Sequence, residues 1–171
     1  NYLITYAILF NKIDIVSLLI HKGSKLDVID NDGKSVVYMA VKYNYNEILD
    51  LLLHFNKTHI GISLVDIQDK NGSIPLHYAI SSKNIEAIEK LIDAGSNTNH
   101  LDNNGHNSLH LSIFSRDINI CELILRNNID INSRTNTGET PLHIACNLEL
   151  DKIALLLIKN NASINLQDFD H

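Results

Sequence analysis

Apolar residues in this chain gather in five segments in which they recur at every third or fourth position. Spacing of this kind places the apolar side chains along one stripe of an α-helix, and that stripe must be buried against other parts of the chain. The pattern therefore predicts five buried helices, whose cores lie at residues 13–20, 47–53, 85–92, 118–125 and 153–158.

A glycine or an asparagine follows each segment at a fixed distance from a small residue that precedes it. These two residue types enter the left-handed backbone conformation just past a helix end more readily than others do. We therefore expect each helix to end at this position. The stops are Gly23, Asn56, Gly95, Asn128 and Asn161, and the small reference residues are Ala7, Ala40, Ala79, Ser112 and Ala145.

A short phrase of sequence recurs ahead of the last three helices, at residues 72–79, 105–112 and 138–145. Successive copies lie 33 residues apart, and degenerate copies end at Ala7 and Ala40. The interval after Ala40 is the exception, because it measures 39 residues. A fixed period in this range is typical of a solenoid, in which a short repeat buries its apolar face only by stacking on its neighbours.

The last copy reads Thr140-Pro141-Leu142-His143-Ile144-Ala145 and matches the T-P-L-H-x-A motif of ankyrin repeats at every fixed position. The copy at 72–79 keeps Pro-Leu-His-x-Ala, and the copy at 105–112 keeps Leu-His. The chain thus resembles the ankyrin-repeat family over essentially its whole length. The resemblance implies an all-α solenoid of stacked helix-turn-helix repeats with β-hairpin tips, forming one domain over 1–171. The expected repeats are 1–29, 30–68, 69–101, 102–134 and 135–167, with the start of another at 168–171.

Residues suited to turns and caps fall where this architecture needs them. Asp30, Asp69 and Asp102 are expected to begin hairpin tips, while Ser73 and Thr140 suit helix N-caps. The turn between the two helices of each repeat departs from the family, which favours glycine there. Asparagine tolerates this geometry, but the other residues should each cost up to about 1 kcal/mol. The five turn residues are Asn11, Asn44, Lys83, Arg116 and Glu149.

Composition narrows the classes of partner. The net charge of −6 argues against a nucleic-acid interface, which would need a basic stripe. Apolar runs are too short to span a membrane. Cys121 and Cys146 are expected to be buried free thiols in a reducing compartment, which places the protein inside the cell, in the cytoplasm or, for a viral or bacterial protein, in the host cytoplasm.

Catalytic and metal-binding roles find little support in the residue pattern. His77, His110 and His143 recur at the repeat interval, and we expect each ring to hydrogen-bond a nearby hydroxyl or carbonyl rather than to bind a metal. Calcium binding at the tip aspartates is the weaker alternative to turn formation, since each tip offers few oxygen ligands. The resemblance also raises hydroxylation of Asn99, Asn132 or Asn165, with a structural role favoured. We therefore expect no enzymatic activity and no cofactor or metal.

Partner binding is the function that the resemblance implies, through a concave surface of hairpin tips and first helices. Large apolar side chains at four exposed positions of this surface (Phe10, Tyr43, Phe114 and Leu148) are candidate anchors, with incidental exposure as the alternative. The candidate site is Phe10, Tyr43, Lys70, Asn71, Asn103, Asn104, His106, Phe114, Asn136, Glu139 and Leu148.

The long repeat and the chain ends carry the remaining expectations. Register places the additional residues at 57–62, where a tolerated loop insertion is favoured over a partner-contacting loop. Both ends fall within repeats, and Leu155 occupies a position that is polar in other repeats. We therefore expect either a segment of a longer array or a last repeat that something else covers, and self-association through that repeat is one way of covering it. The leading hypothesis is an adaptor or scaffold that binds a protein. The first alternative is a substrate-targeting arm of a larger enzyme or ubiquitin-ligase adaptor, and the second is a purely architectural spacer within a long array.

Overall fold

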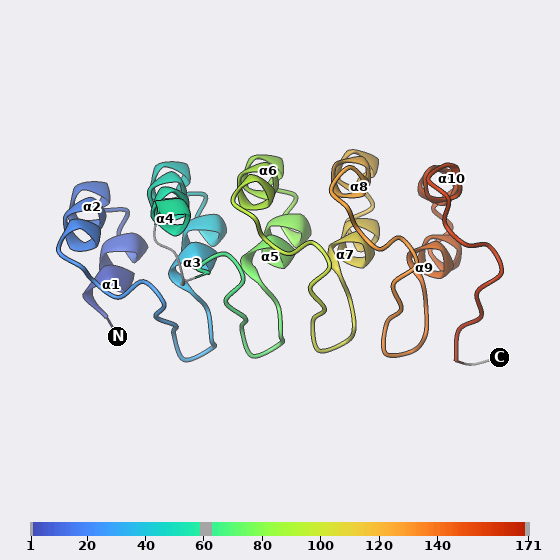
Figure 1. The fold of residues 1–171 in the computed structure, drawn as a ribbon, viewed down its shortest axis with the longest axis horizontal. Helices are drawn as coiled ribbons and strands as arrows, with labels where there is room; N and C mark the ends of the chain where they lie inside the picture. The colour runs from blue at the N-terminus through green and yellow to red at the C-terminus, as the bar shows by residue number, and fades with distance from the viewer. Residues whose placement is uncertain (1, 59–62, 170–171) are drawn as a thin grey trace. The chain divides into compact units, whose positions relative to one another are not determined.

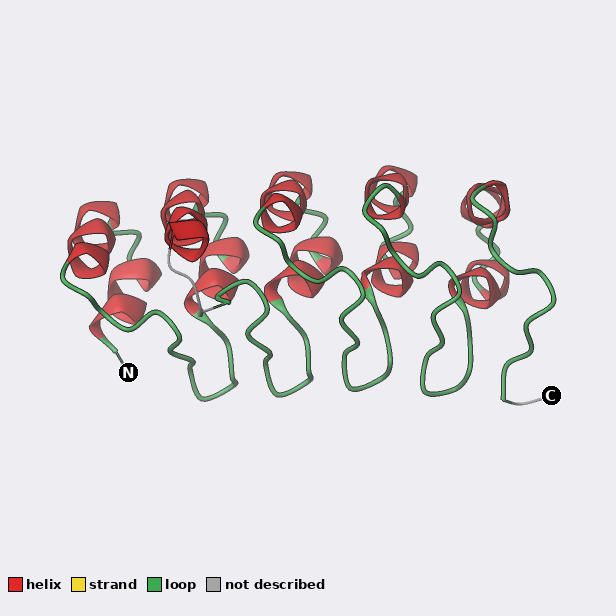
Figure 2. Ribbon diagram, viewed as in Figure 1, coloured by secondary structure: helices red, strands yellow, loops and turns green. Residues whose placement is uncertain are grey.

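The computed structural model describes residues 2–58 and 63–169 of the chain. Ten α-helices lie in this part, and its regular β-structure is a single bridge between Ile29 and Ser35. The all-α class predicted from the sequence is confirmed (Figure 2). The helices are α1 (Leu3–Leu9), α2 (Ile13–His21), α3 (Val36–Lys42), α4 (Asn46–Thr58), α5 (Pro75–Ser81), α6 (Ile85–Asp93), α7 (Ser108–Phe114), α8 (Ile118–Leu125), α9 (Pro141–Asn147) and α10 (Asp151–Lys159).

The chain forms two compact units, the first of which comprises Asn1–Ala79 and Glu86–Ser96. In this unit α1 packs against α2 and α3, α3 against α4, and α2 against α4. Two helical hairpins therefore lie side by side, first helix against first helix and second against second (Figure 1). The apolar stripes meet between them, where Ile4, Ile8 and Leu49 are fully buried. Burial of each such side chain stabilises the fold by about 1.5–3 kcal/mol.

The second unit comprises Ile80–Ile85 and Asn97–His171 and repeats this arrangement. Here α7 packs against α8 and α9, α9 against α10, and α8 against α10. Leu109, Ile120 and Leu157 are fully buried at the junction. Leu142, the equivalent of Leu109 in the next repeat, is only half-buried. Stacking of neighbouring repeats thus supplies the core that a single helical hairpin could not.

The turn between the two helices of each repeat has the predicted left-handed backbone at all five positions. The φ angles are 51° at Asn11, 56° at Asn44, Lys83 and Glu149, and 57° at Arg116. A left-handed conformation brings Cβ too close to the following carbonyl oxygen, which is why glycine would suit these positions. The chain therefore carries strain at Lys83, Arg116 and Glu149.

Four of the five predicted helix stops are also left-handed, with φ of 76° at Gly23, 89° at Gly95, 49° at Asn128 and 66° at Asn161. The stop predicted at Asn56 is wrong, because α4 continues to Thr58. Instead, the side-chain Oδ1 of Asn56 accepts a hydrogen bond from the Leu64 amide at 2.7 Å. Two residues of the expected insertion at 57–62 are therefore helical, and the other four lie outside the described residues.

Helix N-caps were predicted correctly at Thr140 and wrongly at Ser73. The Thr140 side chain accepts from the His143 amide, and the His143 ring accepts from the Thr140 amide, so the two residues form a capping box. Ile74, and not Ser73, occupies the equivalent position before Pro75, the first residue of α5. Ser73 lies one residue earlier, within the hairpin tip, where its amide donates to Asp69 Oδ1 at 3.0 Å.

Burial was predicted correctly for Cys121 and wrongly for Cys146, which is exposed. Cys146 is equivalent by register to Ile113, which is fully buried on α7. The difference follows from packing, since α7 is covered by α9, whereas no further repeat covers α9 within the described residues. Leu155 on α10 is exposed in the same way.

Candidate protein-binding surface

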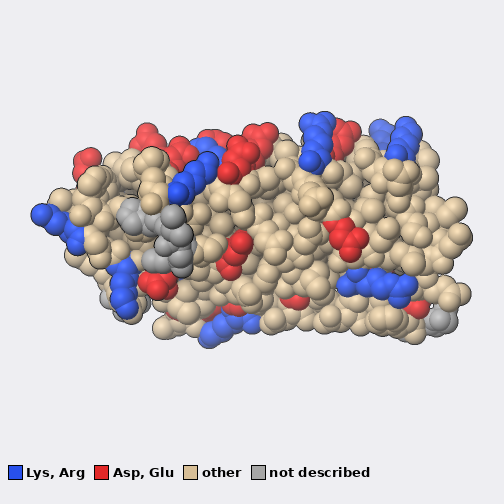
Figure 3. Space-filling model, viewed as in Figure 1, with Lys and Arg blue, Asp and Glu red and all other residues tan. Residues whose placement is uncertain are grey.

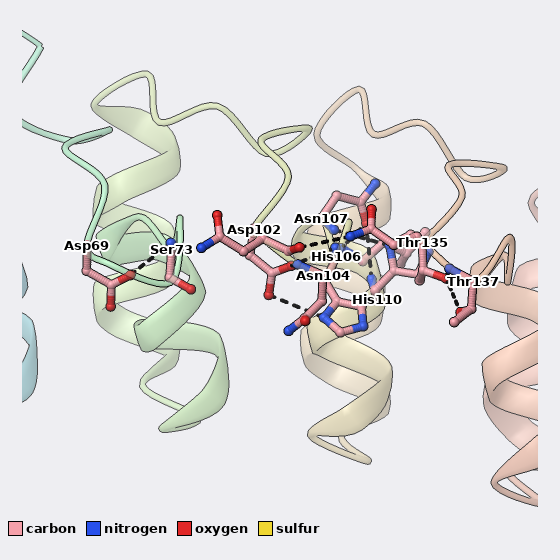
Figure 4. Close-up of polar contacts among 12 residues, drawn as sticks. Asp69, Ser73, Asp102, Asn104, His106, Asn107, His110, Thr135 and Thr137 are labelled. Atoms are coloured by element: carbon pink, nitrogen blue, oxygen red, sulfur yellow. Dashed lines mark hydrogen bonds and ion pairs between the residues drawn. The ribbon is translucent and has the colours of Figure 1, made fainter.

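The hairpin tips are folded by side chains that accept hydrogen bonds from their own backbone. In the first tip, Asp30 Oδ1 accepts from the amides of Asp32 (2.8 Å) and Lys34 (2.9 Å). Asp69 and Asp102 repeat this arrangement, as the dashed lines of Figure 4 show for Asp69 and Ser73. In the fourth tip Thr135 Oγ1 takes the place of the carboxylate. These oxygens are engaged in the turns, which agrees with the structural role preferred over calcium binding.

Within each unit, hydrogen bonds connect neighbouring hairpin tips. In the first unit the Lys70 amide donates to the Asp32 carbonyl at 3.2 Å. In the second, the Asn136 amide donates to the Asn104 carbonyl at 3.0 Å, and Asn136 Nδ2 donates to the Asn103 carbonyl at 2.8 Å. Of the candidate site residues, four therefore connect tips and remain exposed, namely Lys70, Asn103, Asn104 and Asn136.

We use the term inner face for the tips at 30–34, 69–73, 102–106 and 135–139 together with the exposed sides of α1, α3, α5, α7 and α9, taken separately in each unit. In the first unit Phe10 is 65% exposed and Tyr43 is 38% exposed. Lys70 and Asn71 of the second tip are exposed as well. Tyr43 stacks on Tyr45 with ring centroids 5.6 Å apart, and this contact holds its ring in place.

The inner face of the second unit centres on His106 and Phe114. The two rings meet edge to face with centroids 5.2 Å apart, and Phe114 remains 45% exposed. The other side of His106 faces Asp102, with 3.2 Å between Nδ1 and Oδ2 (Figure 4). Glu139 accepts from Asn147 and Thr137, each at 3.0 Å.

Leu148 departs from the expectation that it is exposed, because it is half-buried at the end of α9. The other candidate anchors, Phe10, Tyr43 and Phe114, are exposed as expected. The expectation of four exposed anchors is therefore wrong for Leu148. Whether any of these side chains contacts a partner stays a prediction.

The recurring histidines act as structural residues where their hydrogen bonds are seen. His110 Nδ1 lies 2.7 Å from Asn107 Oδ1, and His143 Nδ1 lies 2.8 Å from Thr140 Oγ1. Burial, and to a lesser extent the nearby His106, lower the pKa of His110 to about 4. The ring is therefore neutral at pH 7. No group of three or more potential metal ligands comes together within residues 2–58 and 63–169.

Two of the three asparagines considered for hydroxylation bridge neighbouring repeats of the second unit. Asn99 Oδ1 accepts from the Asp130 amide at 2.7 Å, and its Nδ2 donates to the Asn128 carbonyl at 3.0 Å. Asn132 Oδ1 accepts from the Ser163 amide at 2.8 Å. These contacts agree with the structural role preferred for these residues.

The first unit contains a cavity that was not predicted from the sequence. It measures about 190 Å³ and lies between α1, α3 and the first tip. Tyr43 lines it, but so do Tyr2, Tyr6 and Tyr38, which were not recognised as surface residues of interest. Tyr2 is the N-cap residue of α1 and lies four positions before Tyr6, and this closeness in the sequence is the signal that could have pointed to them.

Charged side chains are mixed in sign on the face that Figure 3 shows, where Lys and Arg lie scattered among Asp and Glu. On the outer helices of the first unit, Lys90 Nζ lies 2.9 Å from both Asp50 and Glu86. Burial lowers the pKa of Lys90, but hydrogen bonds to these two carboxylates outweigh it and raise the pKa overall. The described helices include none with the length and apolar character needed to cross a bilayer.

Comparison with known proteins gives a consistent result. A family model of ankyrin repeats in three copies matches residues 1–63, 60–135 and 95–168. The putative ankyrin repeat protein L371 of Acanthamoeba polyphaga mimivirus is 43% identical over 100 residues, which cover 58% of this chain and 13% of that protein.

More distant similarity extends to an animal and a poxvirus protein. The NF-kappa-B p105 subunit of Rattus norvegicus is 28% identical over 93 residues, or 54% of this chain and 9% of that protein. The putative ankyrin repeat protein FPV223 of fowlpox virus is 31% identical over 97 residues, or 57% of this chain and 63% of that protein. The chain spans less than two thirds of the length of each of these three relatives.

Proposed function

Because the chain belongs to the ankyrin-repeat family, whose repeats serve as protein–protein interaction modules, we propose that it is an adaptor or scaffold that binds a partner protein through its inner face and catalyses no reaction. The observation that carries this proposal is the exposure of Phe10, Tyr43 and Phe114 at the C-terminal ends of the first helices. Large apolar side chains in such positions do nothing for the core, and aromatic anchors dominate the binding energy of protein interfaces.

The tips support the same proposal from another direction. Their backbones are fixed by hydrogen bonds to Asp or Thr side chains of the same tip and to the neighbouring tip, so the points from which their side chains project are set before a partner arrives. Ordering the surface in advance reduces the entropy lost on binding. Exposed Lys70, Asn71 and Asn103 can then supply polar contacts around the aromatic anchors.

A non-catalytic role fits the chemistry of the described residues. The buried His110 is engaged with Asn107 and remains neutral at pH 7. Burial raises the pKa of the Cys121 thiol to about 11, which leaves it a poor nucleophile. The two cysteines are unpaired, and on this ground we place the protein in a reducing compartment inside the cell.

Affinity capture from the native cell, followed by mass spectrometry, tests the proposal. Phe114→Ala and Tyr43→Ala should each weaken binding of the captured partner by about 30-fold or more, and the double variant should abolish it, while circular dichroism stays that of the wild type. Leu18→Ala is the matched control, since Leu18 is a similarly exposed apolar residue on the outer helix α2. Unchanged affinity in both inner-face variants, or capture of no protein, would contradict the proposal.

A further inference from the structure

We propose that the tyrosine-lined cavity of the first unit, which we call the Tyr–Lys groove, binds an acidic segment of the partner protein, with one apolar or aromatic side chain inserted between the rings and carboxylates paired with Lys34 and Lys42. The inference rests on the proposed function and adds to it the chemistry of the partner.

The shape of the groove suits one side chain of a peptide. It measures about 190 Å³ and opens between α1 and α3, beside the first hairpin tip. Tyr2, the N-cap residue of α1, is 53% exposed, and Tyr6 on α1 is 45% exposed. Tyr43 closes the opposite side from the end of α3. Tyrosine offers a large and rather rigid contact area that combines an apolar ring with a polar hydroxyl, as is typical of protein-binding surfaces.

Two ammonium groups lie over the faces of two tyrosine rings that line the groove. Lys34 Nζ donates to the Tyr38 hydroxyl at 3.0 Å and lies 4.6 Å from the centroid of the same ring. Lys42 Nζ lies 5.4 Å from the centroid of the Tyr43 ring. Contact with an aromatic face orients a cation but does not neutralise its charge. Within the part of the chain that the structure describes, neither group has a carboxylate at salt-bridge distance.

Lys90 differs from Lys34 and Lys42 because its ammonium group is paired with carboxylates of this chain. Lys90 of the same unit lies 2.9 Å from two carboxylates and needs no further anion. The hydrogen bond to Tyr38, and then the nearby Asp32 and Asp30, raise the pKa of Lys34 against the lowering effect of burial, so this group stays protonated at neutral pH. Because no carboxylate of the described residues lies within salt-bridge distance of its Nζ, a carboxylate of the partner can pair with it.

Asp30, the acidic residue that lines the groove, accepts hydrogen bonds within its own hairpin tip. Asp30 uses its Oδ1 to accept from the Asp32 and Lys34 amides, and this contact shapes the tip. The groove thus gathers two cations and one turn-forming carboxylate in a chain whose net charge is −6. Charge complementarity favours a partner segment rich in Asp and Glu, and the four tyrosine rings favour an apolar residue among them.

A displayed library of random 12-residue peptides, selected against the whole chain, tests this chemistry without assuming a partner. The expected result is enrichment of peptides that carry net negative charge and at least one large apolar residue. The double variant Lys34→Gln, Lys42→Gln should bind synthetic copies of these peptides about 5- to 30-fold more weakly. Binding to the wild type should also weaken as salt rises, since exposed ion pairs are screened.

The matched control is Lys22→Gln, Lys25→Gln, which makes the same change in net charge at two exposed lysines of the same unit that do not line the groove. This variant should bind within about twofold of the wild type, because long-range charge contributes little at moderate salt. Circular dichroism of both variants checks that the fold is unchanged.

Several outcomes would overturn the inference. They are enrichment of neutral or basic peptides, equal loss of binding in the two double variants, and no enrichment at all. A partner captured from cells that loses affinity with Phe114→Ala but not with Lys34→Gln, Lys42→Gln would also overturn it, while leaving the proposed function standing. Failure of the proposed function is recognised separately, as the capture of no protein.

Discussion

The close approach of neighbouring hairpin tips can be tested by adding one methyl group at Gly105. A Cβ at this position would lie 2.7 Å from the Asn136 amide nitrogen and 3.0 Å from the Thr135 carbonyl carbon, both of them backbone atoms of the next tip. Contacts this short require the fourth tip to move. Gly95 is the matched control, because its φ of 89° resembles the 80° of Gly105, yet an added Cβ would meet nothing within 4 Å.

The two substitutions share one cost and differ in another. Each places an L side chain in the left-handed region, at about 1–2 kcal/mol. Gly105→Ala must in addition push the tip away, at about 1–3 kcal/mol for overpacking, and stretch the 3.0 Å hydrogen bond from Asn136 to the Asn104 carbonyl, at about 0.5–1.5 kcal/mol. We therefore expect Gly105→Ala to cost about 2–4 kcal/mol more than Gly95→Ala.

Equilibrium urea unfolding followed by circular dichroism measures this difference, and thermal unfolding checks it. A chain of this length loses about 2–4 °C in Tm for each kcal/mol, so Gly105→Ala should melt about 4–16 °C below Gly95→Ala. In the first unit, Gly33→Ala and Gly23→Ala form a second pair with the same logic, since only Gly33 faces a neighbouring tip. Equal losses within both pairs would show that contact between tips contributes no stability.

Three further predictions concern single residues. Lys83→Gly should raise the free energy of unfolding, measured in urea, by about 1 kcal/mol, because it removes the strain of a left-handed lysine. Asn44→Gly, at the same φ of 56°, should raise it by less than half as much, because asparagine tolerates this conformation. The reverse order would show that Lys83 is not strained. Because burial lowers the pKa of His110 to about 4, the unfolded chain binds a proton between pH 6.5 and 4 that the folded chain does not. Stability should therefore fall as pH drops, by about 2 kcal/mol from pH 7.5 to 5, and His110→Gln should remove this part of the loss; an unchanged slope would refute it. Asn132→Ala leaves the Ser163 amide without its acceptor and should lower the free energy of unfolding by about 1–2 kcal/mol in the same urea assay. Asn165→Ala, at an exposed position, should change it by no more than about 0.5 kcal/mol. Equal effects would show that the hydrogen bond between Asn132 and Ser163 contributes no stability.

Much of the backbone could be predicted from the sequence because local rules govern it. The left-handed turn at Arg116 and the stop at Gly95 follow from the repeat register, since each repeat must reverse direction at the same point. Asp102 folds its tip through an Asx turn that depends on its immediate neighbours alone. The capping box of Thr140 and His143 is likewise contained within four residues.

The failures arise where a position depends on residues far away in the sequence. Asparagine often follows a helix end, but it can also lie inside a helix. In the longer repeat α4 ends at Thr58, two residues beyond Asn56. Cys146 has the sequence pattern of a buried residue, yet its burial depends on what covers α9. The Tyr–Lys groove could not be foreseen because its walls come from two helices and a tip, and periodicity gives no information about how their side chains converge.

Amide hydrogen–deuterium exchange of the chain, alone and bound to its captured partner, tests the central claim most directly. The account predicts additional protection at the inner face, in the tips at 30–34 and 102–106 and in the first helices α3 and α7. The outer helices α2, α4 and α8 should exchange at unchanged rates. Protection confined to the outer helices, with the tips and first helices unaffected, would contradict the account.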